Sequence, residues 1–177
     1  MTDNFDRAFQ YALGNEGGYS NHKADSGGAT KYGITLATLS RWRGTVCTPT
    51  EVQLLQRDEA KAIYKANYWD VIKGDQIGDL VIATVLFDAA ILFGTHAVIK
   101  LAQEVFGVMT DGVIGKVTLA MLNRRDGQAS FVLGLQGKLK DRVKAIVEEY
   151  PKNKVFQDGW INRLNRFTTL LPPDTLI

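Results

Sequence analysis

The feature that most constrains the fold is an apolar run, Leu80–Phe93, in which Asp88 is the only charged residue. The run is apolar at nearly every helical position rather than along one stripe, which is typical of a helix buried inside a protein. It is shorter than the roughly 20 residues that a membrane span requires. The sequence therefore predicts a fold built around one buried central helix, with no integral membrane segment.

Amphipathic helical patterns occur on both sides of this run. The expected helices before it are Asn4–Asn15, one capped by Thr35, one behind the capping-box pattern Thr50–Gln53, and one that Asp58 begins and Tyr68 ends. Those expected after it are Thr95–Phe106, Lys116–Leu122, one through Phe131–Tyr150 that Pro151 stops, and one through Phe156–Leu171. The architecture is thus predicted to be mainly α.

The stretch from Gly17 to Gly33 differs from the rest, because it holds five glycines and no helical period. Such a composition predicts turns or a short β-hairpin. We therefore expect a small irregular or β-hairpin lobe near the N-terminus, and we expect the chemistry there, since catalytic groups concentrate on loops held by a rigid scaffold.

Composition excludes several classes of function. The 177 residues suit one compact domain, or one with a small appended module, and the formal net charge of +2 offers no large field to attract nucleic acid. Cys47 is the only cysteine, so no intrachain disulfide can form, and His22 and His96 are the only histidines, which argues against a histidine-rich zinc site. We expect a monomer without metal or organic cofactor.

Charge is unevenly distributed along the chain. From Arg124 to Arg166 there are ten Lys/Arg against five Asp/Glu, which favours a solvated basic face, with attraction to an anionic envelope surface as the alternative. The first residues are polar and no apolar signal segment follows them. We expect synthesis in the cytoplasm.

Two carboxylates flank the glycine-rich stretch. Glu16 follows the first helix, and Asp25 lies nine residues further on. An acid held near aromatic side chains can stay protonated near neutral pH, and glycoside hydrolysis needs such an acid together with a second carboxylate. The alternative is that Glu16 hydrogen-bonds loop amides and that Asp25 forms an Asx turn.

The strings that contain these carboxylates resemble glycoside hydrolase family 108, whose members are N-acetylmuramidases of bacteria and phage endolysins. The signature-like strings are Asn15-Glu16-Gly17-Gly18-Tyr19 and Asp25-Ser26-Gly27-Gly28-Ala29-Thr30-Lys31-Tyr32-Gly33-Ile34-Thr35. The similarity continues through Ala62–Tyr64, Tyr68–Asp70, Leu86–Ala90 and Thr110–Gly115, the last of which resembles a C-terminal peptidoglycan-binding segment.

This resemblance implies a lysozyme-like fold, with a catalytic region at 1–93 and a peptidoglycan-binding helical region at 94–177 packed against it. It implies hydrolysis of the β-1,4 bond between N-acetylmuramic acid and N-acetylglucosamine, with Glu16 as the proton donor. Together with the lack of an apolar signal segment, it implies action on the cell wall after release, through a phage holin. The Glu16–Asp25 spacing matches that of T4 phage lysozyme, where a threonine follows the aspartate. Thr30 comes one position earlier than in that pattern, and Tyr32 is the alternative hydroxyl.

Aromatic and polar side chains are candidates for binding the sugar. Tyr19, Tyr68 and Trp69 are expected to contact substrate, with Trp69 as a wall of the cleft, whereas Tyr64 is at least as well explained as core. Asp88 is either a group facing the cleft or, as the more economical interpretation, half of a structural salt bridge, because an unpaired charge in an apolar run is costly.

Two other functions remain compatible with the sequence. A lytic transglycosylase needs only one glutamate and leaves an anhydro-muramic end, and Asp25 weighs against it because a second carboxylate guides water. A non-catalytic peptidoglycan-binding protein does not require Glu16 at all, so the complete glycine loop with its acid argues against that alternative.

Overall fold

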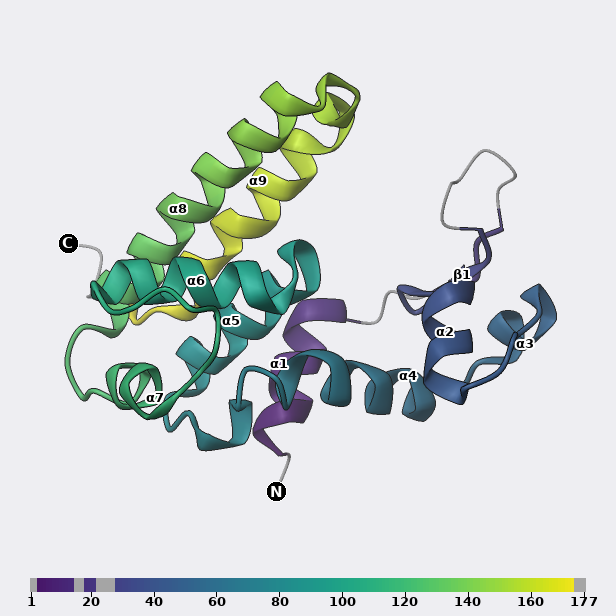
Figure 1. Cartoon of the computed structure of the whole chain (residues 1–177), viewed down its shortest axis with the longest axis horizontal. Coiled ribbons are helices and arrows are strands. Elements are labelled where there is room, and N and C mark those ends of the chain that lie inside the picture. Colours follow the sequence, from purple (N-terminus) through teal and green to yellow (C-terminus); the bar gives the residue numbers. More distant parts are fainter. Residues whose placement is uncertain (1–2, 15–17, 22–27, 174–177) are drawn as a thin grey trace.

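The protein is described here by a computed structural model that defines residues 3–14, 18–21 and 28–173. Figure 1 shows a mainly helical molecule with a small lobe at one side and a long helical arm at the other. Its first elements are α1 (Asn4–Leu13), the strands β1 (Thr30–Lys31) and β2 (Ile34–Thr35), α2 (Leu36–Arg43), α3 (Pro49–Leu54), α4 (Arg57–Tyr64), the π-helix η1 (Lys65–Trp69) and the 3-10 helix η2 (Gly74–Gln76). They are followed by α5 (Leu80–Phe93), α6 (Thr95–Phe106), α7 (Lys116–Leu122), α8 (Gln128–Glu149), η3 (Pro151–Phe156), α9 (Gln157–Asn165) and η4 (Arg166–Leu170).

Helix α5 is the buried centre that its sequence predicts. Residues 82–90 are all buried, and the helix packs against α1, α6 and α8. Asp79 caps it by accepting hydrogen bonds from the amides of Val81 and Ile82. Because α5 contacts helices from both halves of the chain, its burial joins them in one continuous hydrophobic core.

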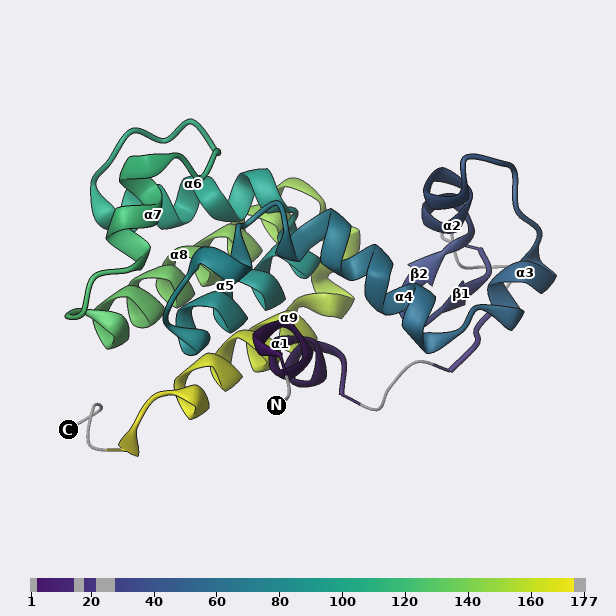
Figure 2. The ribbon, with the colours of Figure 1, turned by 90° about the horizontal axis from the view of Figure 1, so that it is seen from below.

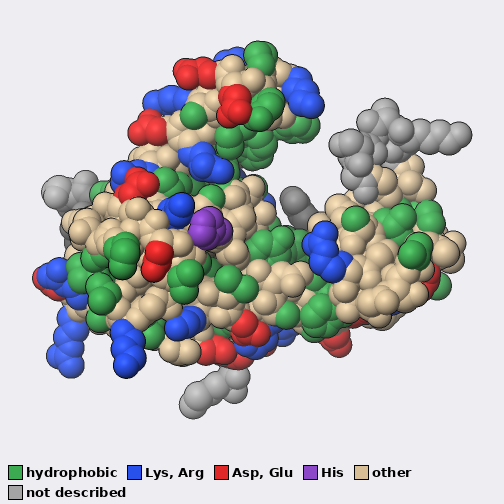
Figure 3. All heavy atoms as spheres, viewed as in Figure 1, with side chains coloured by type: hydrophobic (Ala, Val, Ile, Leu, Met, Phe, Trp, Pro, Cys, Tyr) green, Lys and Arg blue, Asp and Glu red, His purple; other side chains and the backbone are tan. Residues whose placement is uncertain are grey.

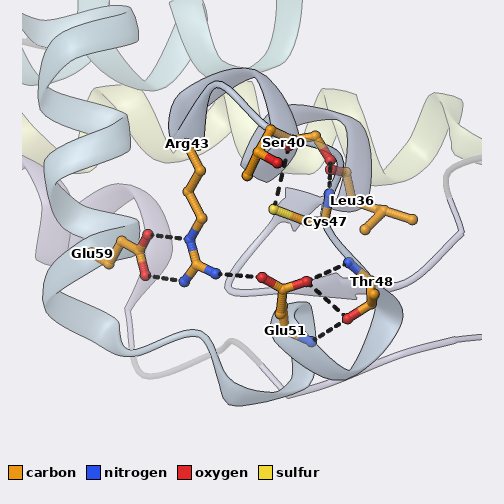
Figure 4. Close-up of polar contacts among 8 residues, drawn as sticks. Leu36, Ser40, Arg43, Cys47, Thr48, Glu51 and Glu59 are labelled. Atoms are coloured by element: carbon orange, nitrogen blue, oxygen red, sulfur yellow. Dashed lines mark hydrogen bonds and ion pairs between the residues drawn. The ribbon is translucent and has the colours of Figure 1, made fainter.

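The small lobe consists of the β1–β2 hairpin with α2 and α3, and α4 connects it to the rest (Figure 2). Arg43, on α2, joins this helix to α3 and α4. Its guanidinium binds both carboxylate oxygens of Glu59 on α4, at 2.8 and 2.7 Å, and one oxygen of Glu51 on α3 (Figure 4). Donation from Arg43 lowers the pKa of Glu59, and hydrogen bonds from the amide and hydroxyl of Thr48 lower that of Glu51. The lobe is therefore fixed by a polar network as well as by its small core.

The arm is formed by α8 and α9, which lie side by side in Figure 1. Leu135, Leu139 and Leu164 are fully buried in it, and the amide of Gln136 donates to the carbonyl oxygen of Leu164 at 2.8 Å. Within the described part of the chain, no helix combines the length and apolar character needed to cross a membrane.

The sequence predicted the position of most helices and was wrong about some of their ends. Helix α3 begins behind Thr48 rather than Thr50, because Pro49 fits the first helical position and Glu51 completes a capping box with Thr48. Helix α4 begins after Gln56 rather than Asp58. The last segment is not one helix, since two 3-10 helices flank α9.

Candidate active site

The two carboxylates that the sequence singles out, Glu16 and Asp25, lie outside the described residues. The structure defines the chain up to Gly14, the segment 18–21 between the two carboxylates, and the chain from Gly28 onward, which forms the hairpin. We call these described segments, which flank the two carboxylates, the frame of the site.

The C-terminal end of α1, which leads into Glu16, is held by three arginines. Arg57 donates to the carbonyl of Gly14 at 2.9 Å, Arg163 to that of Ala12 at 3.2 Å, and Arg166 to that of Tyr11 at 3.1 Å. The last carbonyls of a helix have no partner within the helix and attract cations. The arginines come from α4, α9 and η4, so three separate elements fix the point from which Glu16 follows.

Asp88 holds one of these arginines in place. Its carboxylate, 1% exposed, receives three contacts of 2.7 to 3.1 Å from Nε and Nη2 of Arg163. Burial raises the pKa of Asp88, and Arg163 opposes that shift. Asp88 is thus paired, and its burial leaves no oxygen for a sugar: the prediction that it contacts substrate is wrong, and the salt-bridge interpretation is confirmed.

A pocket of about 520 Å³ opens beside this end of α1. It is lined by residues 10–14 and, on the other side, by Gly159, Asn162, Arg163 and Arg166. One wall of this depression is therefore formed by the residues that precede the candidate acid in the sequence.

On the far side of the loop, the β1–β2 hairpin defines the frame. Ser20 and Thr30 form an antiparallel bridge with two backbone hydrogen bonds of 2.8 Å, which closes residues 21–29 into a loop. The Thr30 hydroxyl donates to the carbonyl of Gly28 at 3.2 Å. The two described segments on either side of Asp25 in the sequence are therefore joined at a fixed distance.

The turn of this hairpin is pressed against α4. Tyr32 and Gly33 both have positive φ, 52° and 73°, as a tight two-residue hairpin turn requires. The hydroxyl of Tyr64 donates to the carbonyl of Tyr32 at 3.1 Å, and a Cβ on Gly33 would lie 2.4 Å from that hydroxyl. Tyr64 is 3% exposed, which confirms its interpretation as a core residue.

Because Tyr64 is buried, the protein is expected to lose stability at alkaline pH. Burial, with Tyr68 adding to it, raises the pKa of Tyr64 to about 12 from an ordinary value of 10.0. A raised pKa gives stability that is full below pH 10 and lost as pH rises towards 12, by up to about 2 to 3 kcal/mol. Tyr64→Phe should lower the free energy of unfolding by about 1 kcal/mol at pH 7. Between about pH 9 and 11, its free energy of unfolding, measured in urea, should then fall less than that of wild type. Tyr19→Phe, at an exposed position, is the control; an equal alkaline loss in Tyr64→Phe and wild type would contradict the assignment.

The π-helix η1 decides which aromatic side chain faces the core. In a regular α-helix the position four residues after Tyr64 would face inward, which is Tyr68. The five-residue turn of η1 moves that position to Trp69, which is 0% exposed and donates from Nε1 to Asp75 at 2.7 Å. The prediction that Trp69 forms a wall of the cleft is wrong for this reason.

Four of the predicted site residues in the described part of the chain remain available to a ligand, among them the half-buried Thr30. Tyr19 is 37% exposed, and Tyr32 and Tyr68 are half-buried, with Tyr68 stacked on Tyr64 at 5.6 Å between ring centres. Figure 3 shows a deep hollow between the small lobe and the arm. The sequence did not predict the three arginines that shape the frame, Arg57, Arg163 and Arg166. No local pattern marks an arginine whose partner is a distant carbonyl.

Comparison with known proteins identifies the family. A model of glycosyl hydrolase 108 matches residues 9–94, a range that contains both carboxylates. The structure of Brucella abortus SagA is similar, with 36% sequence identity, a TM-score of 0.78, and coverage of 93% of this chain and 91% of that one. No curated protein matches the chain significantly. The chain belongs to glycosyl hydrolase family 108 and is a glycoside hydrolase with a mainly α, lysozyme-like fold.

Proposed function

We propose that the protein hydrolyses the β-1,4 bond between N-acetylmuramic acid and N-acetylglucosamine in peptidoglycan, as an N-acetylmuramidase. The observation that carries this proposal is the family match over residues 9–94, which includes Glu16, Asp25 and the glycine-rich segment between them. Peptidoglycan is the substrate class that the family implies.

Glu16 acts as general acid and protonates the oxygen of the leaving sugar. The proposal is supported by the three arginine contacts at the end of α1, since a general acid must be positioned closely against the atom that it protonates. Asp25 orients or activates water, and Thr30 or Tyr32 assists from the hairpin. Tyr19 and Tyr68 contact the sugars, because both retain exposed ring surface.

The helices of residues 94–177 form the peptidoglycan-binding part in this proposal. The arm packs on α5 and α6, so a glycan bound by it lies next to the catalytic frame. An endolysin role, in which a holin gives the enzyme access to the wall, belongs to the same proposal, and lysis on co-expression with a holin tests it.

The decisive test is mass spectrometry of the fragments that the protein releases from purified sacculi. A muramidase leaves reducing N-acetylmuramic acid ends. Anhydro-muramic ends, one water lighter, would instead assign the protein to the lytic transglycosylases, and intact sacculi with bound protein would indicate a binding protein without hydrolytic activity.

A further inference from the structure

The outer part of the arm presents apolar side chains to solvent. Tyr150 and Phe156 are 49% and 55% exposed. Figure 3 shows hydrophobic side chains gathered on the face of the arm that is turned towards the hollow. Contiguous apolar surface of this kind marks an interaction site more often than a neutral surface.

Three aromatic rings follow one another along the arm towards its base. The ring centres of Phe156 and Trp160 are 5.9 Å apart, and those of Trp160 and Phe93 are 6.5 Å apart. Phe156 ends η3, Trp160 belongs to α9, and Phe93 is the last residue of α5. We call these three residues the aromatic row.

The aromatic row begins beside the candidate active site. Helix α5 carries both Phe93 and Asp88, and α9 carries both Trp160 and Arg163. The ion pair between Asp88 and Arg163 is the one that fixes the end of α1 ahead of Glu16. The row is therefore built on the same two helices as the frame of the site and extends away from it.

We propose that the aromatic row is a subsite for the glycan strand, on which N-acetylated sugars stack as the strand extends out of the hollow. The inference rests on the proposed function and adds the place where the strand is held. Sugar rings have an apolar C–H face that stacks on aromatic side chains, and half-exposed rings offer both contact area and little loss of side-chain entropy on binding.

Two ammonium groups near the row suit the same ligand, although the exposed carboxylates of Glu148, Glu149 and Asp158 lie in the same stretch of chain. Lys152 and Lys154, both exposed, lie in the η3 segment that presents Phe156. The peptide stems of peptidoglycan carry free carboxylates, which these ammonium groups attract. A membrane surface is the other ligand that binds aromatic and lysine side chains, and Phe156 at the outer end of the arm would suit it. The row, however, continues from Phe156 along the arm to Phe93 on α5, which favours an extended strand over a flat bilayer.

The test compares Phe156→Ala with Val155→Ala, a change at a neighbour that is 78% exposed, has no ring and lies outside the aromatic row. Binding of an N-acetylglucosamine hexasaccharide and of purified sacculi is measured in the Glu16→Gln background, and kinetics on sacculi are measured in the otherwise wild-type chain. Phe156→Ala should weaken binding and raise KM, each about two- to tenfold, and leave kcat unchanged. Phe156→Trp should retain binding, and Val155→Ala should match wild type. Trp160→Ala should weaken binding as Phe156→Ala does, whereas Trp160→Tyr, which keeps a ring, should retain it.

Three results would overturn the inference. The first is that Phe156→Ala binds sacculi as well as its parent does. The second is that Val155→Ala loses as much binding as Phe156→Ala. The third is that the protein prefers phosphatidylglycerol vesicles to sacculi and that this preference depends on Phe156. Failure of the proposed function is separate, because it shows as a wild-type protein that releases no muramic ends at all. If Phe156→Ala cleaves sacculi as wild type does, only the proposed role of the aromatic row is contradicted.

Discussion

Glu16→Gln is expected to lower the rate of glycan release from sacculi by a factor on the order of 10² to 10⁴ while leaving the melting temperature close to that of wild type. The amide has nearly the shape of the carboxyl group but cannot donate the proton that the leaving oxygen needs, and that proton transfer accounts for a factor of this size. The rate is measured as reducing ends released per unit time. Binding to sacculi should survive, because the contacts to the sugars remain.

Glu104→Gln is the matched control, since Glu104 is a surface residue paired with Lys138 on the arm. It should release fragments at the wild-type rate. Asp25→Asn should lower the rate as well, through loss of the group that orients water. Wild-type release by Glu16→Gln would mean that another residue is the acid.

Arg163→Met is expected to destabilise the protein by about 3 to 5 kcal/mol, because it leaves Asp88 buried without its partner. For a chain of this length, that corresponds to a fall in melting temperature of about 6 to 20 °C. An unpaired buried carboxylate has a raised pKa in the folded state, so the loss should be largest at neutral pH and smaller in acid, where Asp88 is protonated. Thermal melting between pH 4 and 7 measures both effects.

The double variant Asp88→Asn with Arg163→Met should recover much of the lost stability, since no charge is then buried alone. Arg166→Met is the matched control: Arg166 is exposed and makes one hydrogen bond to the carbonyl of Tyr11, so its loss should cost about 1 kcal/mol. If the single Arg163 variant melted like the Arg166 variant, the ion pair would contribute little to the fold.

The parts of the fold that the sequence predicted are those where side-chain pattern alone determines the structure. Helices α5, α6 and α7 begin and end where apolar periodicity and flanking glycines place them. Thr35 caps α2 as expected, through its hydroxyl and the amide of Thr38. In each case the decisive interactions join residues that are close in the chain.

The parts that the sequence did not predict depend on the path of the backbone. Nothing in the residues 65–69 marks a π-turn, yet that turn buries Trp69 and leaves Tyr68 half-buried. The interpretation of Asp88 was correct about pairing, but its partner Arg163 is 75 positions away and has no local signature. Patterns in the sequence thus located the loop that carries the chemistry, and only the three-dimensional structure revealed what holds it.

The arginine contacts at the end of α1 also impose an order on biosynthesis. Arg163 and Arg166 are separated from their carbonyl partners by 151 and 155 positions, so both must leave the ribosome before the last turn of the first helix can be secured. At translation rates of roughly 5 to 20 residues per second, the segment leading into Glu16 waits for about ten seconds or more without these partners. A nascent or truncated chain that lacks them is therefore expected to be a poor hydrolase, and wall-degrading activity is acquired only once synthesis has passed residue 166.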